Sequence, residues 1–171
     1  VSEEKGVLTS DEALAGARDI LAEQFADDAG IRDQLRKLSW REGKIESKVK
    51  DAAEDDKQIF EMYYEYEEQV NRIVPHRILA MNRGEKEDVL KISIAIPVEK
   101  AISLMERNWI PMHANCAAVE EVKLAIADSY KRLIAPSIER ELRTELSEKA
   151  EAQAIHIFAE NLRNLLLQPP M

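Results

Sequence analysis

The sequence predicts a mainly α protein, an irregular multi-helix array around a long C-terminal helix with a small two-stranded antiparallel β-ribbon. Five glycines and 5% aromatic residues favour helix over sheet. Residues 137–168 contain neither Gly nor Pro, and apolar residues recur at helical spacing through most of the chain. Only two short segments, 44–50 and 88–96, alternate in the period-2 pattern of strands.

The C-terminal helix, predicted over 136–168, is the element around which we expect the rest to be organised. At a rise of about 1.5 Å per residue it is about 48 Å long. Its apolar stripe comprises Ile138, Leu142, Leu146, Ala150, Ala154, Phe158, Leu162 and Leu166, with Ile155 and Leu165 alongside. Because four residues turn about 400°, the stripe creeps by about 40° per step. We therefore expect the helix to brace short elements from earlier in the chain against two differently oriented sides.

The same helix carries favourable charge pairs and clear end signals. Glu139 with Arg143, and Glu145 with Lys149, have the i,i+4 spacing of stabilising ion pairs. Pro136 suits the first turn of a helix, and Pro169-Pro170 stops it.

Two helices are predicted at the N-terminal end. Thr9 and Glu12 have the spacing of a capping box, so a helix begins there. Gly16 within this helix suggests that another backbone comes close at that point. Asp27 or Asp28 caps the second helix, which ends near Gly43.

The predicted ribbon pairs 44–50 with 88–96 in antiparallel fashion. It must lie against the helices, because an isolated two-stranded hairpin is only marginally stable in water. Between the two strands we expect an acidic helix or pair of short helices over 52–72, and then a helix from Pro75 to Arg83 that Gly84 ends.

Further helices are expected over 98–107 and 119–133, with a connector between them. The second is amphipathic, ends at Pro136 and turns or kinks into the long helix. The resulting organisation is a single helical fragment over 1–171, with short helices and the ribbon over 9–135 and the long helix over 136–168.

Composition and charge exclude several classes of protein. The net charge of −9 argues against the whole chain being a nucleic-acid platform, which needs a basic face. Residues 31–50 are nonetheless basic and 51–70 acidic, and we interpret both as solvated faces. No apolar run approaches the about 18 residues of a membrane span, and one cysteine cannot form an intrachain disulfide. We therefore expect a cytoplasmic protein.

Catalytic and metal-binding motifs are not found in the sequence. It contains no Gly-rich phosphate loop, Ser elbow or HExxH, so we expect no enzyme activity and no cofactor. His113 and Cys116 have the spacing of half a zinc site, but His76 and His156 stand apart, so we expect no metal. Cys116 is interpreted as a small buried hydrophobe and His156 as a packing residue.

Several stretches resemble the bacterial Tex proteins, transcription accessory proteins related to a eukaryotic elongation factor that binds histones. They are EALAGARDILAE (12–23), LRKLSWREG (35–43), HRILAMNRGEKE (76–87), DSYKRLIAPSIERELR, KAEAQAI and FAENLRNLLLQPP. The resemblance implies that the chain is an internal piece of a longer protein. A YqgF-type RNase H-like domain should begin just past Met171, followed by helix-hairpin-helix elements and an OB-fold RNA-binding domain. It implies no active site within this chain.

The signature HRxLAxxRGEKE of that family matches at 76–87, and it holds the first group of candidate binding residues. One position departs from the family pattern, because Val74 stands where proline is usual and Pro75 directly precedes His76. Arg77 and Arg83 are candidates for bidentate contacts with phosphate or an acidic partner. The alternative is that Arg77 and Glu85 form a buried network between helices.

The second group of candidate binding residues is a basic run formed by Arg36, Lys37, Arg41, Lys44 and Lys48. Trp40 within this run either stacks on a base or is buried. The complete set of candidate nucleic-acid-binding residues is Arg36, Lys37, Arg41, Lys44, Lys48, Arg77, Arg83 and Lys86.

The function expected from these observations is a helical scaffold in a transcription accessory protein. It would position nucleic-acid-binding domains that lie further along the longer chain, and would make weak phosphate contacts itself. The alternative is an interaction module that docks a transcription or RNA-processing partner through its acidic block and long helix. Expected partners are RNA or DNA, mainly through domains absent from this chain, and the transcription machinery, with no membrane and no small-molecule substrate.

Overall fold

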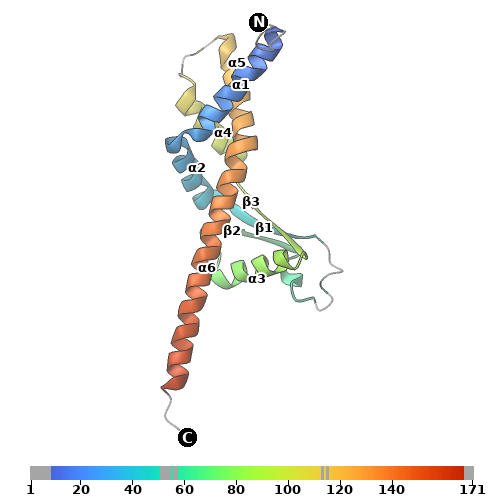
Figure 1. The fold of residues 1–171 in the computed structure, drawn as a ribbon, viewed down its shortest axis with the longest axis vertical. Helices are drawn as coiled ribbons and strands as arrows, with labels where there is room; N and C mark the ends of the chain where they lie inside the picture. Colours follow the sequence, from blue (N-terminus) through green and yellow to red (C-terminus); the bar gives the residue numbers. More distant parts are fainter. Residues whose placement is uncertain (1–8, 51–54, 56–57, 113, 115, 168–171) are drawn as a thin grey trace. The chain divides into compact units, whose positions relative to one another are not determined.

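The computed structural model describes residues 9–50, 55, 58–112, 114 and 116–167. Its elements in chain order are α1 (Ser10–Asp27), α2 (Ala29–Glu42), β1 (Lys44–Val49), a 3-10 turn (Glu61–Tyr63), β2 (Glu65–Gln69), α3 (Pro75–Lys86), β3 (Leu90–Ala95), α4 (Val98–Trp109), α5 (Ala117–Asp128), a π-helical segment (Ser129–Ile134) and α6 (Ala135–Leu166) (Figure 1). The prediction of a mainly α fold with a long C-terminal helix is confirmed. The chain divides into two compact units, residues 1–39 with 96–138 and residues 40–95 with 139–171.

All the regular elements that the structure describes in the first unit are helices. Helix α1 lies against α5 and the π-helical segment, and α4 lies against α5. The buried side chains at its centre are Ala22, Phe25, Ile31, Leu35, Ala101, Met105, Ala125, Ile126, Tyr130, Ile134 and Ile138. A buried hydroxyl joins two of these helices, because Ser129 Oγ donates to the carbonyl of Ala22 at 2.7 Å. This bond satisfies a polar group that would otherwise be costly to bury.

Side chains cap the first two helices as the sequence predicts. The Glu12 N–H donates to Thr9 Oγ1 and the Thr9 N–H donates to Glu12 Oε2, both at 3.2 Å, which completes the capping box. Asp28 Oδ1 accepts from the Ile31 N–H at 2.8 Å, so Asp28 caps α2. The close approach of another backbone to Gly16 is wrong, because no atom lies within 4 Å of the position its Cβ would occupy.

The predicted break at Pro136 takes the form of a π-helical segment. The Ala135 N–H donates to the carbonyl of Tyr130, five residues earlier. Proline lacks an N–H, and its ring collides with the carbonyl four residues before it in a regular α-helix. The wider π-helical turn accommodates Pro136, so the chain remains helical from α5 into α6.

The second unit is built on a three-stranded antiparallel sheet in the order β2-β1-β3. Residues Lys44 to Val49 pair with Ala95 to Leu90, so the predicted pairing of 44–50 with 88–96 is confirmed. The prediction of a helix or pair of short helices over 52–72 is wrong for Glu65–Gln69, which form a third strand, while a short 3-10 helix spans Glu61–Tyr63. Residues 51–54, 56 and 57 of that prediction lie outside the described residues.

The acidic composition of Glu65–Gln69 explains why this strand was not predicted. Glutamate favours helices over strands, and only Tyr66 in β2 is a typical strand residue. The ladder with β1, in which Lys44 faces Gln69 and Lys48 faces Glu65, overrides that local preference.

Helix α3 lies against β3, and a glycine permits their close contact. A Cβ on Gly84 would lie 2.6 Å from Leu90 Cδ1 and 3.1 Å from Phe60 Cδ1. The prediction that Gly84 ends the helix is wrong, since α3 continues to Lys86. Gly84 is buried inside the helix, and its missing side chain makes room for Leu90.

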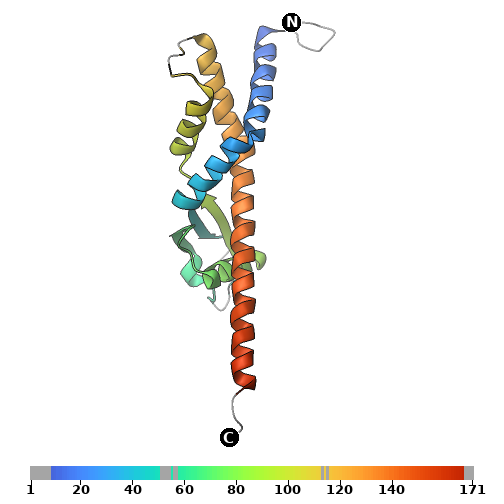
Figure 2. The ribbon, with the colours of Figure 1, turned by 90° about the vertical axis from the view of Figure 1, so that its left-hand side faces the viewer.

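Helix α6 begins in the first unit and continues in the second. Ile138 is buried in the first, and Leu142, Leu146 and Ala150 are buried in the second. From residue 151 to residue 167 every side chain is exposed. In Figures 1 and 2 the C-terminal half of α6, drawn in red, has no other described helix or strand of the second unit beside it. The predicted bracing by the apolar stripe therefore does not extend to Ala154, Phe158, Leu162 and Leu166, which are exposed.

Candidate nucleic-acid-binding residues and their ion pairs

The eight candidate cations are divided between the two units. Arg36 and Lys37 lie on α2 in the first unit. The remaining six lie in the second unit, Arg41 at the end of α2, Lys44 and Lys48 on β1, and Arg77, Arg83 and Lys86 on α3.

Four of the candidate cations of α2 and β1 lie at the surface beside carboxylates, and Arg36 is exposed on α2. Lys37 Nζ is 2.7 Å from Asp33 Oδ2, and Arg41 Nη2 is 2.8 Å from Glu42 Oε1. On the sheet, Lys48 Nζ is 3.5 Å from Glu46 Oε2, and Lys44 bonds to Glu67 across the ladder.

These surface pairs are weak. The hydrogen bond to Glu67, and its negative charge, raise the pKa of Lys44, which stays protonated at neutral pH. Exposed ion pairs contribute only about 0 to 1 kcal/mol, so a phosphate of high local charge competes with such carboxylates at little cost.

The guanidinium of Arg77 is bound by side chains of β2, so it is not free to form a bidentate contact with phosphate. Its Nη1 donates to Tyr66 Oη at 2.8 Å and to Glu68 Oε2 at 2.9 Å, and its Cζ lies 5.7 Å from the centre of the Tyr66 ring. Burial, together with a hydrogen bond from Tyr66 to Glu68, raises the pKa of the tyrosine. Arg77 therefore fastens the start of α3 to the outer strand.

The other two candidates on α3 are at its exposed C-terminal end. Arg83 Nε is 2.8 Å from Glu87 Oε1, an i,i+4 pair at the surface. Lys86 is exposed in the last turn of the helix. These two residues, unlike Arg77, have the accessibility that a phosphate contact requires.

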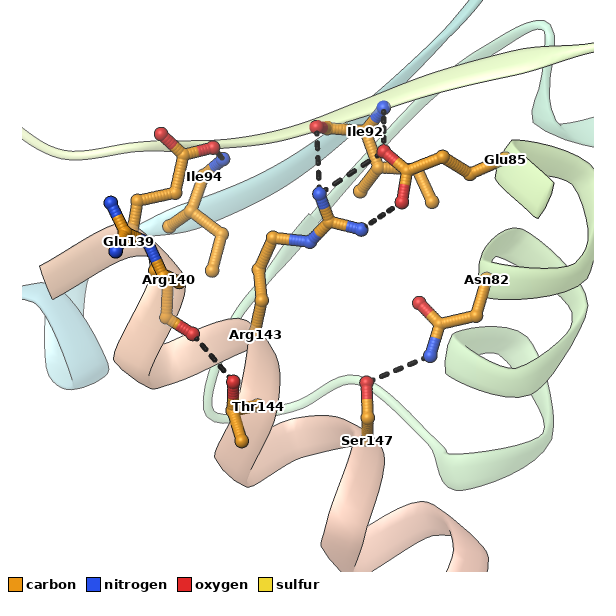
Figure 3. Close-up of polar contacts among 9 residues, drawn as sticks. All are labelled: Asn82, Glu85, Ile92, Ile94, Glu139, Arg140, Arg143, Thr144 and Ser147. Carbon is orange, nitrogen blue, oxygen red and sulfur yellow. Dashed lines mark hydrogen bonds and ion pairs between the residues drawn. The ribbon is translucent and has the colours of Figure 1, made fainter. Parts of the chain in front are cut away.

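Glu85, the acidic member of the same signature, binds α6. Arg143 Nη1 donates to Glu85 Oε1 at 3.1 Å and Arg143 Nη2 donates to Glu85 Oε2, as Figure 3 shows. The same guanidinium donates to the carbonyl of Ile92 at 3.4 Å, and Glu85 Oε1 accepts the Ile92 N–H at 3.4 Å. The bidentate pair thus clamps α3, α6 and β3 together.

Two more polar contacts strengthen this clamp. The Ile94 N–H donates to Glu139 Oε1 at 3.0 Å, and Asn82 Nδ2 donates to Ser147 Oγ at 2.8 Å (Figure 3). The alternative interpretation, a network between helices, is confirmed for Glu85, which joins α3 to α6. It is wrong for Arg77, whose contacts are with Tyr66 and Glu68 of strand β2.

Sequence reasoning missed the role of Arg143. The i,i+4 spacing predicts a pair with Glu139, but Arg143 binds Glu85, which is 58 residues away. The pairing of Lys149 with Glu145 is confirmed, with Nζ 2.6 Å from Oε1. The only signal for this pair in the sequence was Glu85 itself, which has no basic residue three or four positions away along the helix.

Trp40 is only partly exposed. Lys149 Nζ lies 4.4 Å from the centre of its ring, a cation–π contact that covers part of the indole. A base would have to displace Lys149 in order to stack on that face.

The remaining histidine and cysteine predictions are corrected where the structure describes them. Cys116 is exposed just before α5 and is not a buried hydrophobe. His156 is exposed on α6, with Nε2 3.7 Å from Glu160 Oε1, so it is not a packing residue. His113 lies outside the described residues.

The described residues contain neither a cluster of metal ligands nor a membrane-spanning helix. Within the part of the chain that the structure describes, no three His, Cys, Asp or Glu side chains are grouped as metal ligands would be. Among those residues there is also no helix with the length and apolar character needed to cross a membrane.

The fold and its contacts define this chain as a helical region with a small antiparallel sheet. An arginine and a glutamate fasten its helix α3 to the long helix α6. A family model described as Tex central region-like matches residues 1–158. The chain therefore belongs to the Tex family, as the central region of transcription accessory proteins.

Curated relatives agree with this assignment. The chain is 52% identical over 172 residues to "Uncharacterized protein YdcI" of Bacillus subtilis, covering all of this chain and 24% of that protein. It is 33% identical to "Transcriptional accessory protein Tex" of Neisseria gonorrhoeae, covering 92% of this chain and 21% of that protein. It is 32% identical to human "S1 RNA-binding domain-containing protein 1", covering 98% of this chain and 18% of that protein. The chain thus spans less than a quarter of the length of these relatives.

Proposed function

We propose that this region is a structural scaffold in a transcription accessory protein, and that α6 provides the surface on which other parts of a longer protein pack. Its own contacts with nucleic acid are weak and electrostatic. The observation that carries the proposal is the exposed apolar face of α6.

That face is continuous and wide. At 100° per residue its side chains span an arc of about 100°, the width typical of a helix that packs against a neighbour. Its members are Ile155, Phe158, Leu162, Leu165 and Leu166, which are 68%, 68%, 45%, 65% and 74% exposed. Contiguous apolar surface of this kind normally marks an interaction site.

The lengths and names of the relatives support a scaffold role within a longer transcription protein. Each is at least four times as long as the matched region, and their names include a transcriptional accessory protein and an S1 RNA-binding domain-containing protein. Residues that bind nucleic acid strongly are accordingly proposed to lie in the rest of the longer protein.

The charges of this chain support weak contacts of its own. A net charge of −9 repels nucleic acid as a whole. The candidate cations Lys37, Arg41, Lys44, Arg77 and Arg83 all lie beside carboxylates. Phosphate must compete with each of these carboxylates.

Two charges placed on the apolar face test the scaffold role. Phe158→Glu with Leu162→Glu leaves the thermal unfolding midpoint of the 171-residue chain unchanged, because both side chains are already exposed. In the longer protein the same pair lowers the midpoint by several degrees, because the face is covered there. Gln153→Glu with Asn164→Glu, which adds the same charge to the opposite face of α6, is the control. Equal effects of the two pairs in the longer protein would contradict the scaffold role.

A salt titration tests the phosphate contacts. The chain is expected to bind single-stranded and duplex nucleic acid weakly at low salt, with an affinity that falls steeply as salt rises. Arg36→Ala with Lys37→Ala and Arg41→Ala abolishes this binding. Replacement of Arg107, Lys131 and Arg140, three exposed cations outside the candidate set, removes the same charge and serves as the control. Absence of binding at low salt removes the phosphate contacts from the proposal and leaves the scaffold.

A further inference from the structure

The two outer strands of the sheet differ in how their outward-facing backbone groups are satisfied. In an antiparallel ladder, alternate residues direct their N–H and C=O groups toward the neighbouring strand and away from it. On β3 the outward-facing residues are Leu90, Ile92 and Ile94. Glu85 accepts the Ile92 N–H, Arg143 donates to the Ile92 carbonyl, and Glu139 accepts the Ile94 N–H (Figure 3). Side chains of α3 and α6 thus satisfy both backbone groups of Ile92 and the N–H of Ile94 on this edge of the sheet.

The phase of the ladder on β2 is fixed by a hydrogen bond at each of its ends. The Val49 N–H donates to the carbonyl of Tyr64 at 2.9 Å, and the Val70 N–H donates to the carbonyl of Gly43 at 3.0 Å. Tyr64 and Val70 therefore face β1, as do the residues at every second position between them. The outward-facing residues of β2 are Glu65, Glu67 and Gln69.

At two of these three residues, Glu65 and Glu67, the outward backbone groups have no hydrogen-bond partner in the described part of the chain. The carbonyl of Gln69 accepts from the N–H groups of Arg72 and Ile73 at 3.0 and 3.1 Å. Within the described part of the chain, no hydrogen bond reaches the outward N–H and C=O groups of Glu65 or Glu67. Four backbone groups therefore lie in a row along an extended strand, ready to pair with another strand.

The charge of this open edge selects its partner. Strand β2 carries three glutamates and no cation. Glu67 lies directly opposite Glu46 in the ladder, an unfavourable pairing of like charges. The bond from Lys44 to Glu67 and the approach of Lys48 to Glu46 relieve it in part. A second copy of β2 would bring further glutamates beside these, so self-pairing is disfavoured. A strand that carries Lys or Arg at alternate positions would relieve the repulsion.

We propose that β2 is a docking edge for an extended basic peptide of a partner protein. The peptide adds a fourth strand to the sheet and exchanges hydrogen bonds with the backbone of Glu65 and Glu67. Lys or Arg side chains at alternate positions of the peptide pair with the carboxylates of the same two residues. Main-chain bonds supply affinity and the alternate side chains supply specificity, as in other cases of strand addition to a sheet edge. The docking edge uses no residue of the apolar face of α6, so it is independent of the scaffold role.

A direct test uses a synthetic probe. A fluorescent ten-residue peptide that alternates Lys with Val and Thr is titrated into the 171-residue chain, and binding is followed by anisotropy. Two comparison peptides carry Glu in place of Lys, or N-methyl groups that block the backbone bonds. Only the unmodified Lys peptide is expected to bind, and amide exchange measured by NMR should slow at Glu65 and Glu67 in the complex.

Two variants at one position separate backbone pairing from charge. Glu67→Pro removes the outward N–H and leaves those facing β1 intact, and proline is tolerated on edge strands for that reason. Glu67→Gln removes the same charge but keeps the N–H. We expect Glu67→Pro to weaken binding about tenfold more than Glu67→Gln does, as loss of a main-chain bond to a strand requires. Circular dichroism checks that both variants are folded.

The proposal is overturned if the Lys peptide does not bind, if the Glu or N-methylated peptide binds equally well, or if amide exchange at Glu65 and Glu67 does not change. Equal weakening by the two variants at Glu67 would also overturn it, because charge alone would then explain the binding. Should Glu67→Pro fail to fold, the exchange measurement on the unaltered chain still decides the matter.

Discussion

Arg143 on α6 and Glu85 on α3 form a bidentate pair in which the two guanidinium nitrogens bind the two carboxylate oxygens. The pair also satisfies both backbone groups of Ile92 on the outward edge of β3. Their side chains are 28% and 35% exposed, so the pair is partly desolvated and differs from the surface pairs of the candidate cations. The second unit is therefore held by directional polar contacts as well as by apolar packing.

Arg143→Ala is expected to lower the free energy of unfolding by about 2 to 3 kcal/mol, because it leaves Glu85 and the carbonyl of Ile92 without their donor. Urea unfolding measures the change. Arg140→Ala, which removes an exposed arginine from the same helix, is the control and should change stability by less than about 0.5 kcal/mol. Equal costs for the two variants would show that the pair does not hold the unit together.

Two glycines inside helices give a second matched comparison. Gly84→Ala places a Cβ 2.6 Å from Leu90 Cδ1, and Leu90 is buried, so we expect a loss of about 1 to 3 kcal/mol. Gly16→Ala places its Cβ in open space within α1, so the higher helix propensity of alanine should stabilise the chain by up to about 1 kcal/mol. Thermal unfolding of both variants tests the opposite signs. A stabilising Gly84→Ala would contradict the close contact between α3 and β3.

Two leucines on α6 test the division of that helix. Leu142 is 0% exposed and Leu162 is 45% exposed. Leu142→Ala should cost about 3 kcal/mol through lost burial and a residual cavity, whereas Leu162→Ala should cost less than about 1 kcal/mol. Urea unfolding of the 171-residue chain provides the comparison. A large cost at Leu162 would mean that the C-terminal half of α6 is covered within this chain.

A pH dependence is expected from Asp55. Burial favours the neutral form of this carboxyl, but hydrogen bonds from the Phe60 and Ile59 N–H groups and from the Tyr64 hydroxyl outweigh it and lower the pKa. Because the pKa is lower in the folded than in the unfolded chain, the ionised form contributes stability above its ordinary pKa of about 3.9. That contribution is lost as the pH falls through the folded value.

Unfolding measured at neutral pH and at acid pH checks this expectation. Asp55→Asn should be less stable than the unaltered chain at neutral pH and should lose less stability on acidification. Tyr64→Phe removes one of the three donors and should lie between the two. If acidification lowers the stability of Asp55→Asn as steeply as that of the unaltered chain, Asp55 does not contribute to the pH dependence of stability.

Several predictions that depend on local spacing were confirmed. Thr9 and Glu12 form their capping box, Asp28 caps α2, and Lys149 pairs with Glu145. The length and position of α6 also followed from the absence of Gly and Pro over 137–168. Each of these features involves residues within one or two helical turns, so the sequence contains all the partners.

Features that join distant segments were not predictable in the same way. The strand at Glu65–Gln69 depends on its ladder with β1 and overrides a composition typical of helix. Arg143 could bind Glu139 or Glu85, and only the approach of α3 to α6 decides in favour of Glu85. The same holds for the exposure of Cys116 and His156.

By itself the sequence determined the helical class, the caps, the long C-terminal helix, the antiparallel pairing of 44–50 with 88–96 and the membership of the Tex family. Only the tertiary structure decided which charges neutralise one another, that β2 forms the outer strand, and where the apolar stripe of α6 stops being covered. The physical reason is that helix propensity and capping act between neighbours in the chain. Ion pairs, strand ladders and burial depend on which distant residues meet, and many pairings satisfy the same pattern of charges and apolar side chains.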